Sequence, residues 1–344
     1  MTKAPKDLGA SMQARLRNLA RQRGEDVQGL LMQFVLERLL HRLAASAHAG
    51  DFLLEGAMLF AAWTSTPHRA TRDLDLHGTG SPSRERLVEV FRAVAATAVE
   101  PDGVTFLAAT VRASRIRDDQ PYQGIRVTLT AVMATARIGV QVDVGFGDAV
   151  HPAPVKLQYP SLLGLPTPRL RAYPREAVVA EKFHAMVALG ELNSRMKDFY
   201  DLSVLAGGFR FDGARLGASI RATFDRRATD LPIEQPIAMR REFAALPGKD
   251  AQWRAFVRRS RLLDGAVPLV DVVRQSTSNP ARHRLAARCP PKLPSPTNPY
   301  RTALSPAGLS GGDDLSPRLA RRCSASVTCR PVRDEKLDRQ WRIV

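Results

Sequence analysis

The chain has 344 residues, 44% of them hydrophobic, which is enough for about two domains with sizeable cores. It contains no run of about 18 apolar residues and no apolar N-terminal stretch, so we expect neither a membrane span nor a secretory signal, and a cytoplasmic protein. The net charge is +17, and residues 275–344 hold 13 Lys and Arg against 5 Asp and Glu, so they supply +8 of it. The other residues supply +9. This excess of positive charge favours a polyanionic partner such as nucleic acid or nucleotide.

Residues 12–45 carry two apolar stripes at helical spacing, separated by Gly24-Glu25-Asp26. We therefore expect two helices within residues 1–50 that pack on the domain that follows. Two helices joined by a short turn can also form a helix-turn-helix. A DNA-binding transcription regulator is the alternative that this segment leaves open.

Residues 52–64 predict a short strand, a turn and then a buried helix, because the apolar run is interrupted by Glu-Gly. In the next segment Leu74 and Leu76 alternate with Asp73 and Asp75. Successive side chains of a strand point to opposite faces. The leucines are therefore expected to face a core, and both carboxylates to point to the other face.

Residues 84–98 predict a helix, and three strand-like runs follow at 104–111, 124–132 and 137–146. In the third run, apolar residues alternate with polar ones, and Asp143 is among the polar ones. Asp143 should thus leave its strand on the polar face, as the earlier pair does. The short connection between the second and third runs indicates an antiparallel hairpin.

The proline-rich segment 147–172 is expected to be a loop. Two helices should follow it. The first starts at Pro174, whose missing N–H costs nothing in a first helical turn. The second starts near Ser194, which is a suitable N-cap. Further helices are expected at 212–226 and 237–260.

Residues 276–344 combine Pro, Ser, Arg and Gly without periodicity, so we expect a disordered Arg/Pro-rich tail. All three cysteines of the chain fall in this tail. Their odd number and their spacing argue against both a disulfide framework and a zinc site.

The three aspartates together suit nucleotidyl transfer. Mg²⁺ prefers oxygen ligands and binds through few carboxylates plus substrate phosphates. Two such ions activate an attacking hydroxyl and stabilise a triphosphate leaving group. Asp73 and Asp75 on one strand face, with Asp143 on a neighbouring strand, would supply the carboxylates, and Gly56 would let backbone N–H groups approach the phosphates. Three unrelated surface acids are the alternative, which the order and spacing of the three make less favoured.

Five segments together resemble a known family. They are Phe52-Leu-Leu-Glu-Gly-Ala-Met-Leu-Phe60, His68-Arg-Ala-Thr-Arg-Asp-Leu-Asp-Leu76, Val142-Asp-Val-Gly-Phe-Gly-Asp148, Tyr173-Pro-Arg-Glu-Ala-Val-Val-Ala-Glu-Lys-Phe183 and Arg195-Met-Lys-Asp-Phe-Tyr-Asp-Leu202. With them the chain resembles the AbiEii/AbiGii-type toxin nucleotidyltransferases of bacterial toxin–antitoxin and phage-defence systems, within the polymerase-β-like superfamily. The resemblance covers roughly residues 12–275. It implies an α+β fold, with a polymerase-β-like mixed sheet flanked by helices, a helical C-terminal domain and a disordered tail.

The resemblance also implies domain boundaries and roles for individual residues. Residues 51–165 would form the nucleotidyltransferase core and residues 166–275 the helical domain. Two Mg²⁺ ions would be held by Asp73 and Asp75, with Asp143 as the third acid, while Lys182 and Asp198 would complete the catalytic set. The nucleotide-binding residues would be Gly56, Ala57, Arg72, Lys182, Arg195 and Asp201.

By the same resemblance the substrate is an NTP and the acceptor is RNA, with tRNA 3′ ends as a target. A separately encoded antitoxin would be the protein partner. The chain departs from the family turn at Glu55, where Lys or Arg is usual, and at Ala57, where Gly or Ser is usual. Glu55 would place a negative charge near the triphosphate unless it points away. A catalytically impaired nucleotide- or RNA-binding member of the same fold is therefore the alternative.

Overall fold

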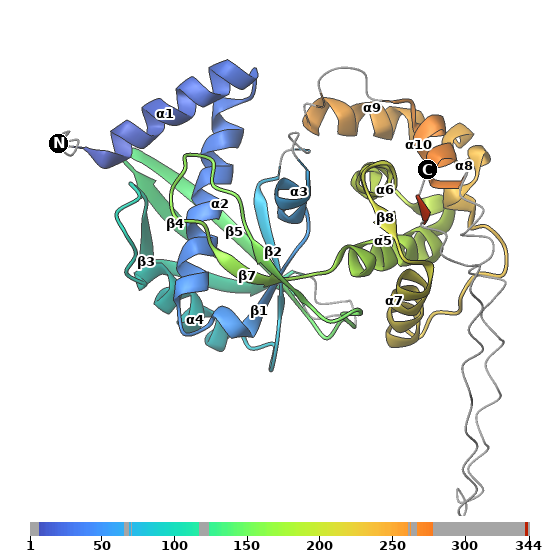
Figure 1. Ribbon diagram of the computed structural model, residues 1–344, viewed down its shortest axis with the longest axis horizontal. Helices are drawn as coiled ribbons and strands as arrows, with labels where there is room; N and C mark the ends of the chain where they lie inside the picture. The colour runs from blue at the N-terminus through green and yellow to red at the C-terminus, as the bar shows by residue number, and fades with distance from the viewer. Residues whose placement is uncertain are drawn as a thin grey trace, which may run out of the picture.

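The computed structural model describes residues 7–64, 69, 71–116, 124–260, 262, 267–277 and 341–342. Two bodies lie side by side in it (Figure 1). We call residues 7–172 the sheet lobe and residues 173–277 the helical lobe. Each buries hydrophobic residues at its centre, and the two lobes share one continuous cluster of them.

A seven-stranded mixed sheet with the order β3-β4-β5-β2-β1-β7-β6 forms the sheet lobe. Strand β2 runs parallel to β5 and antiparallel to β1, which in turn runs parallel to β7. The predicted α+β class, with a mixed sheet flanked by helices, is confirmed. The strands are β1 (Phe52–Glu55), β2 (Asp73–Gly78), β3 (Thr105–Arg115), β4 (Ile125–Met133), β5 (Ala136–Phe146), β6 (Val155–Gln158) and β7 (Arg169–Ala172).

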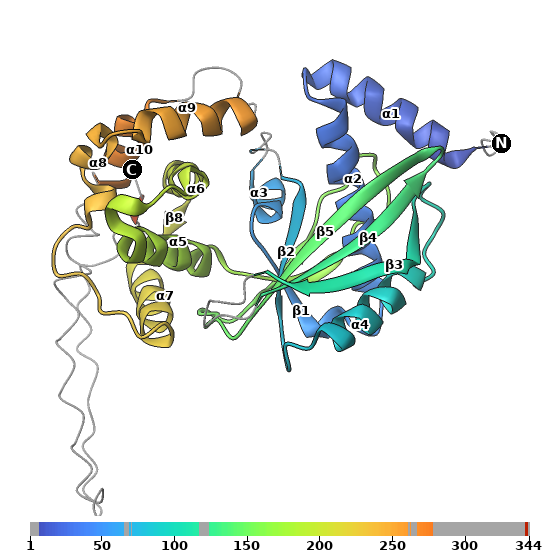
Figure 2. The ribbon, with the colours of Figure 1, turned by 180° about the vertical axis from the view of Figure 1, so that it is seen from behind.

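Alternation along the strands decides which face of the sheet is buried. Leu74 and Leu76 of β2 are fully buried, whereas Asp73 and Asp75, which alternate with them, are not. This apolar face packs on α2 (Val27–Ala45) and α4 (Arg84–Ala96). In Figure 2 strands β3, β4 and β5 lie in front of α2, so their polar face is turned to the viewer.

The expectation of a loop at residues 147–172 is wrong, because the segment contains β6 and β7. In β7 Leu170 and Ala172 enter the core while the two arginines are exposed. Four residues in a proline-rich segment are too few to show this alternation as a pattern. The sheet therefore extends beyond the predicted limit at residue 165.

The helices predicted at 12–45, 84–98 and 212–226 are present. The predicted cap Ser194 is wrong, since the N-cap of α6 is Arg195 and no side chain caps it. The single run expected at 237–260 is split, because Pro and Gly follow Leu246 and start a new helix. The remaining helices are α1 (Leu8–Arg23), α3 (Met58–Trp63), α5 (Arg175–Leu189), α6 (Met196–Gly208), α7 (Gly213–Arg226), α8 (Arg241–Ala245), α9 (Lys249–Ser260) and α10 (Leu269–Thr277).

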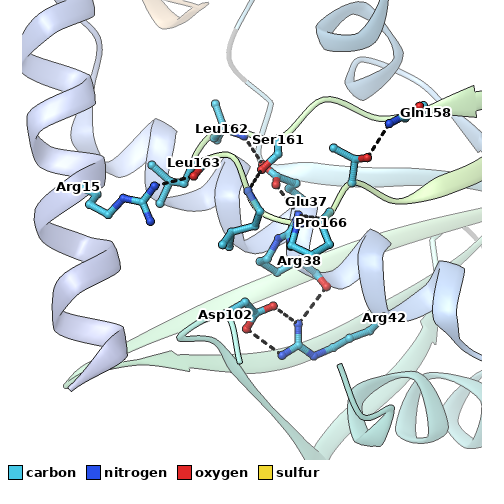
Figure 3. Close-up of polar contacts among 12 residues, drawn as sticks. Arg15, Glu37, Arg38, Arg42, Asp102, Gln158, Ser161, Leu162, Leu163 and Pro166 are labelled. Carbon is cyan, nitrogen blue, oxygen red and sulfur yellow. Dashed lines mark hydrogen bonds and ion pairs between the residues drawn. The ribbon is translucent and has the colours of Figure 1, made fainter. Parts of the chain in front are cut away.

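Buried charges on α2 hold two loops of the sheet lobe in place (Figure 3). Arg42 donates to both oxygens of Asp102, at 2.7 and 3.0 Å, just before β3. Glu37 pairs with Arg38 and accepts a hydrogen bond from the backbone N–H of Leu162 at 2.9 Å. Burial raises the pKa of Glu37, and the Leu162 N–H and Arg38 oppose this rise. Because an unpaired buried charge is costly, these contacts fix both loops on α2.

No helix in the described part of the chain is long and apolar enough to cross a membrane. The tail expected to be disordered, residues 276–344, lies outside the described residues except for the end of α10 and β9 (Trp341–Arg342). Strand β9 pairs antiparallel with β8 (Arg210–Phe211) of the helical lobe. The cysteines lie outside the described residues as well.

Candidate active site

Acidic residues form a row across three neighbouring strands on the polar face of the sheet. Asp75 on β2 is paired in register with Asp143 on β5 and, on its other side, with Glu55 on β1. Asp73 lies two residues earlier on β2 and shares this face. Paired residues of neighbouring strands lie about 5 Å apart and point the same way. The structure therefore brings Asp73, Asp75 and Asp143 together.

Gly56 lies directly against Asp75. It has a φ of 71°, and a Cβ built there would lie 2.1 Å from Asp75 Oδ2 and 2.7 Å from Asp75 Cβ. Only glycine accommodates both this backbone conformation and this approach. Ala57, also predicted to bind nucleotide, is buried at the N-cap of the six-residue helix α3. The turn between β1 and α3 thus passes against the carboxylate row.

Asp143 has a partner that the sequence did not reveal. Arg126 stands opposite it on β4 and donates from Nε and Nη2 to the two Asp143 oxygens, at 2.9 Å each. Such a planar bidentate pair is among the stronger charged contacts. The carboxylates of Asp73 and Asp75, in contrast, form no ion pair with another described residue. Asp143 can therefore bind a cation only if one of its carboxylate oxygens is released by Arg126, or if the Arg126 side chain moves away.

The carboxylates of Asp73 and Asp75 are held where ionisation is unfavourable. Burial raises the pKa of Asp75 to about 6, and Asp143 and Asp73 add to the rise, while Lys197 opposes it. Burial and Asp143 likewise raise the pKa of Asp73, against the effect of Arg126 and Lys197. Raised pKa values in adjacent carboxylates indicate a deficit of positive charge, which a bound cation would supply.

We expect metal binding to this row to weaken as the pH falls through about 6, because a cation then has to displace the proton on Asp75. The pKa of Asp75 is raised, so the carboxylate is ionised above about pH 6 and protonated below it. The apparent affinity should fall by about tenfold per pH unit below that value. Titration with Mn²⁺, followed by electron paramagnetic resonance between about pH 5 and 8, measures this dependence. An affinity that is constant from about pH 5 to 7 would contradict it.

Lys182 on α5 is enclosed by two aspartates of α6. Its Nζ lies 2.6 Å from Asp198 Oδ1 and 2.8 Å from Asp201 Oδ2. Burial alone would lower the pKa of Lys182, but the two carboxylates outweigh burial and raise it. Asp201 also accepts two hydrogen bonds from Arg69, at 2.9 and 3.1 Å. The Asp201 carboxylate is thus paired with two cations inside the protein.

Arg69 connects the two lobes at the site. It lies four residues before Asp73, and its pKa is raised because Asp201, Asp198 and Asp75 together outweigh the effect of burial. Sequence reasoning missed it, since nothing distinguishes one arginine of an arginine-containing loop from the next. Arg72 and Arg195, both predicted to bind nucleotide, are exposed. The backbone N–H of Arg195 donates a hydrogen bond to Oδ1 of Asn193.

Lys197 is the second residue that sequence reasoning missed. It is exposed, next to Asp198 on α6, and it forms no ion pair with another described residue. Its positive charge nevertheless lowers the pKa of both Asp73 and Asp75. Lys197 of the helical lobe is therefore close enough to the carboxylate row for its charge to favour ionisation of both aspartates. The signal was present, because Lys197 belongs to the segment Arg195-Met-Lys-Asp198.

Glu55, the departure noted in the sequence, belongs to a buried acidic group near the junction of the lobes. Burial raises its pKa well above the ordinary value, and Glu181, Asp75 and Asp148 raise it further. Burial and Asp148 also raise the pKa of Glu181 to about 7. Ionisation of Glu55 is therefore less favourable here than in water.

The residues fit a divalent cation in their chemistry. Asp73 and Asp75 offer oxygen donors on one face, and burial together with the charge of Asp143 raises the pKa of both. In the part of the chain that the structure describes, no three acidic, His or Cys side chains already stand in metal-binding positions. A cation held by two aspartates plus substrate phosphates needs no third protein ligand.

Comparison with known proteins gives the following matches. The family model described as nucleotidyl transferase AbiEii toxin, type IV toxin–antitoxin system, matches residues 38–275. No curated protein matches the chain. Two solved structures from Helicobacter pylori, JHP933 and a protein whose proposed activity is nucleotidyl transfer, are each 13% identical over 76% of this chain, with a TM-score of 0.44. The matches cover 90% of JHP933 and 93% of the other protein.

Proposed function

The chain belongs to the AbiEii nucleotidyl transferase toxin family, whose model matches residues 38–275, and from this we propose that it transfers a nucleotide from an NTP to a hydroxyl of an RNA acceptor. The acceptor oxygen forms a bond to the α-phosphorus, the bond between that phosphorus and the bridging oxygen breaks, and pyrophosphate leaves. The hydroxyl proton is lost to solvent or to a nearby base. The observation that carries the proposal is the row of Asp73 and Asp75 beside Asp143, with the positive charge of Lys197 acting on both aspartates.

Asp73 and Asp75 would hold two Mg²⁺ ions, which lower the pKa of the attacking hydroxyl and neutralise the triphosphate. Asp143 would act as the third acid once Arg126 shares it. Gly56 supports this assignment, because its missing side chain leaves the backbone against Asp75. The protein itself contributes mainly position and charge, as phosphoryl transfer requires.

The helical lobe would bind the nucleotide and orient it. Lys197 is placed to contact a phosphate as a point charge, and the exposed Arg72 and Arg195 could add to it. Lys182 and Asp198 stay paired in a buried position, so we assign them the task of holding the start of α6, and with it Lys197, against the sheet. A conformational change on nucleotide binding is not needed for this role.

The alternative, an impaired binding member of the fold, depended on the charge of Glu55. Burial and neighbouring carboxylates disfavour the ionised form of Glu55, which weakens this argument for an inactive protein. Because the family is described as the toxin of a type IV toxin–antitoxin system, we propose a separately encoded antitoxin as partner. We also propose action in the cytoplasm on a tRNA-like acceptor.

A labelling experiment tests the proposal. Purified protein is incubated with total RNA and each α-labelled NTP in turn, with Mg²⁺ or with EDTA. We expect label in one or a few discrete RNA bands, with one preferred NTP, and none with EDTA. Label on the protein instead of RNA would show a different acceptor. No label in any combination would refute the transferase.

A further inference from the structure

The polar face of the sheet continues beyond the carboxylate row onto β3, β4 and the far end of β5. Its exposed part carries arginines and small polar residues rather than acids. We define the polar sheet face by Arg112, Ser114, Arg126, Thr128, Arg137 and Gln141. No helix covers these strands on this side in Figure 2. A Cβ at Gly139, between Arg137 and Gln141, would meet no atom within 4 Å, so this face is open there.

Strand register connects this face to the site. Arg112 pairs with Thr128, Thr128 with Gln141, and Gln141 with Asp73, so the four form one row across neighbouring strands. Strands lie about 4.8 Å apart, which puts Arg112 about 14 Å from Asp73. Arg137 lies four residues from Gln141 along β5, or about 13 Å. Both arginines thus lie within roughly 15 Å of Asp73.

The polar sheet face carries an excess of positive charge. Arg126 neutralises Asp143. Arg137 is exposed and forms no ion pair with another described residue. Arg112 is exposed and donates only to backbone carbonyls of Ala109 and Val111 in the β3 bulge, so its charge is uncompensated. A polyanion lying across β3 to β5 would meet Arg112 and Arg137 on its way to the aspartates.

We propose that the polar sheet face binds the backbone of a double-stranded segment of the acceptor RNA and directs its 3′ end to Asp73 and Asp75. This inference rests on the proposed function. A single strand is usually held by stacking on aromatic rings, and the six residues have none. Duplex RNA is recognised through phosphates and 2′-hydroxyls, for which arginine, Thr, Ser and Gln are suitable partners.

A protein partner fits this face less well. Protein interfaces have a central region of aromatic and apolar residues. Of the large hydrophobic residues exposed in the described part of the chain, only Ile116 adjoins the polar sheet face, at the outer end of β3. The face also offers no aromatic anchor. Binding of the antitoxin elsewhere on the molecule is compatible with this inference.

The test compares two double variants that remove the same charge. Arg112→Gln/Arg137→Gln alters the polar sheet face, and Arg84→Gln/Arg92→Gln alters exposed arginines of α4, which packs on the opposite face. The ligand is a fluorescent RNA hairpin with a single-stranded 3′ end, titrated by anisotropy in EDTA without NTP. We expect the first variant to bind about tenfold more weakly at moderate salt, with a salt slope shallower by about two, and the second to match the wild type.

Equal affinity of the two variants would overturn the inference, whether both are weakened or neither is. So would a first variant that binds RNA normally but loses a protein partner. Matching thermal unfolding of both variants excludes a folding defect as the cause. Because the binding assay contains no NTP or metal, it is independent of transfer. Transfer to RNA with equal binding by both variants would refute this inference alone, whereas absence of transfer to any acceptor would refute the proposed function.

Discussion

Replacing the two aspartates, Asp73→Asn/Asp75→Asn, is expected to reduce nucleotide transfer by at least about a thousandfold. Metal ions contribute several kcal/mol of charge stabilisation in such reactions, and every 1.4 kcal/mol corresponds to about tenfold in rate. The amides keep the shape of the carboxylates but bind divalent cations poorly. Transfer is measured with the preferred NTP and RNA at saturating Mg²⁺. Activity within about tenfold of the wild type would show that the reaction does not use these carboxylates.

The same variant should unfold at a higher temperature than the wild type near pH 7.5. The pKa of Asp75 is raised from 3.8 to about 6 on folding, so its ionised form opposes folding. The cost is on the order of 1–3 kcal/mol above about pH 6, and it vanishes below about pH 4, where the carboxyl is protonated in both states. The unfolding temperature of the variant should therefore exceed that of the wild type by several degrees near pH 7.5, and this difference should disappear at about pH 4.

The matched control is Asp250→Asn/Asp271→Asn, which changes the same charge at two helical ion pairs, one exposed and one partly exposed. Such pairs contribute little to stability, so neither transfer nor unfolding temperature should change appreciably. A wild-type-like control beside an inactive and more stable Asp73/Asp75 variant separates loss of function from loss of fold. An inactive variant that also unfolds at lower temperature would leave a folding defect as the explanation and contradict the stability prediction.

Asp201→Ala is expected to be the most destabilising single change at the site. Asp201 is fully buried and holds both Arg69 and Lys182. Removing one member of a buried charged set costs about 3–5 kcal/mol, because the remaining charges lose their compensation. For a protein of this size we expect the unfolding temperature to fall by about 10 °C, with transfer reduced because Arg69 no longer joins the lobes.

Calorimetry of Asp201→Ala beside Asp250→Ala measures this difference. The Asp250 pair with Arg254 is exposed, and its loss should change the unfolding temperature by no more than about 1–2 °C. Arg69→Ala should fall between the two, since Lys182 still neutralises Asp201. Equal unfolding temperatures for the Asp201 and Asp250 variants would mean that the buried network adds nothing to stability.

Much of the sheet lobe was predictable because its strands are long enough to show alternation. The segments around Asp75 and Asp143 placed both carboxylates on polar faces, and the structure pairs these two residues in register. Strand β7 was missed because Leu170 and Ala172 give only one period of alternation. The order of the strands was not predictable, since parallel pairing of β2 with β5 depends on contacts far apart in the chain.

The ion pairs of the site could not be predicted from sequence for a related reason. Arg126 occupies an ordinary polar position of an alternating strand, and only the pairing of β4 with β5 sets it opposite Asp143. Arg69 meets Asp201 across 132 residues of chain. The resemblance implies a nucleotide-binding role for Asp201, and the structure pairs its carboxylate with Arg69 and Lys182. Helical spacing shows which residues are neighbours and not whether they face solvent.

The two halves of the site are held by different kinds of bonds. Backbone hydrogen bonds between β1, β2 and β5 set the spacing of Asp75 and Asp143, so no single side-chain replacement can lengthen it. The distance from this row to Lys197 depends instead on side-chain ion pairs such as Arg69 with Asp201. An inhibitor that contacts only the aspartates would therefore meet one invariant geometry. A bisubstrate compound that spans both lobes would be sensitive to sequence variation at the ion pairs, which offers a route to selectivity among related toxins.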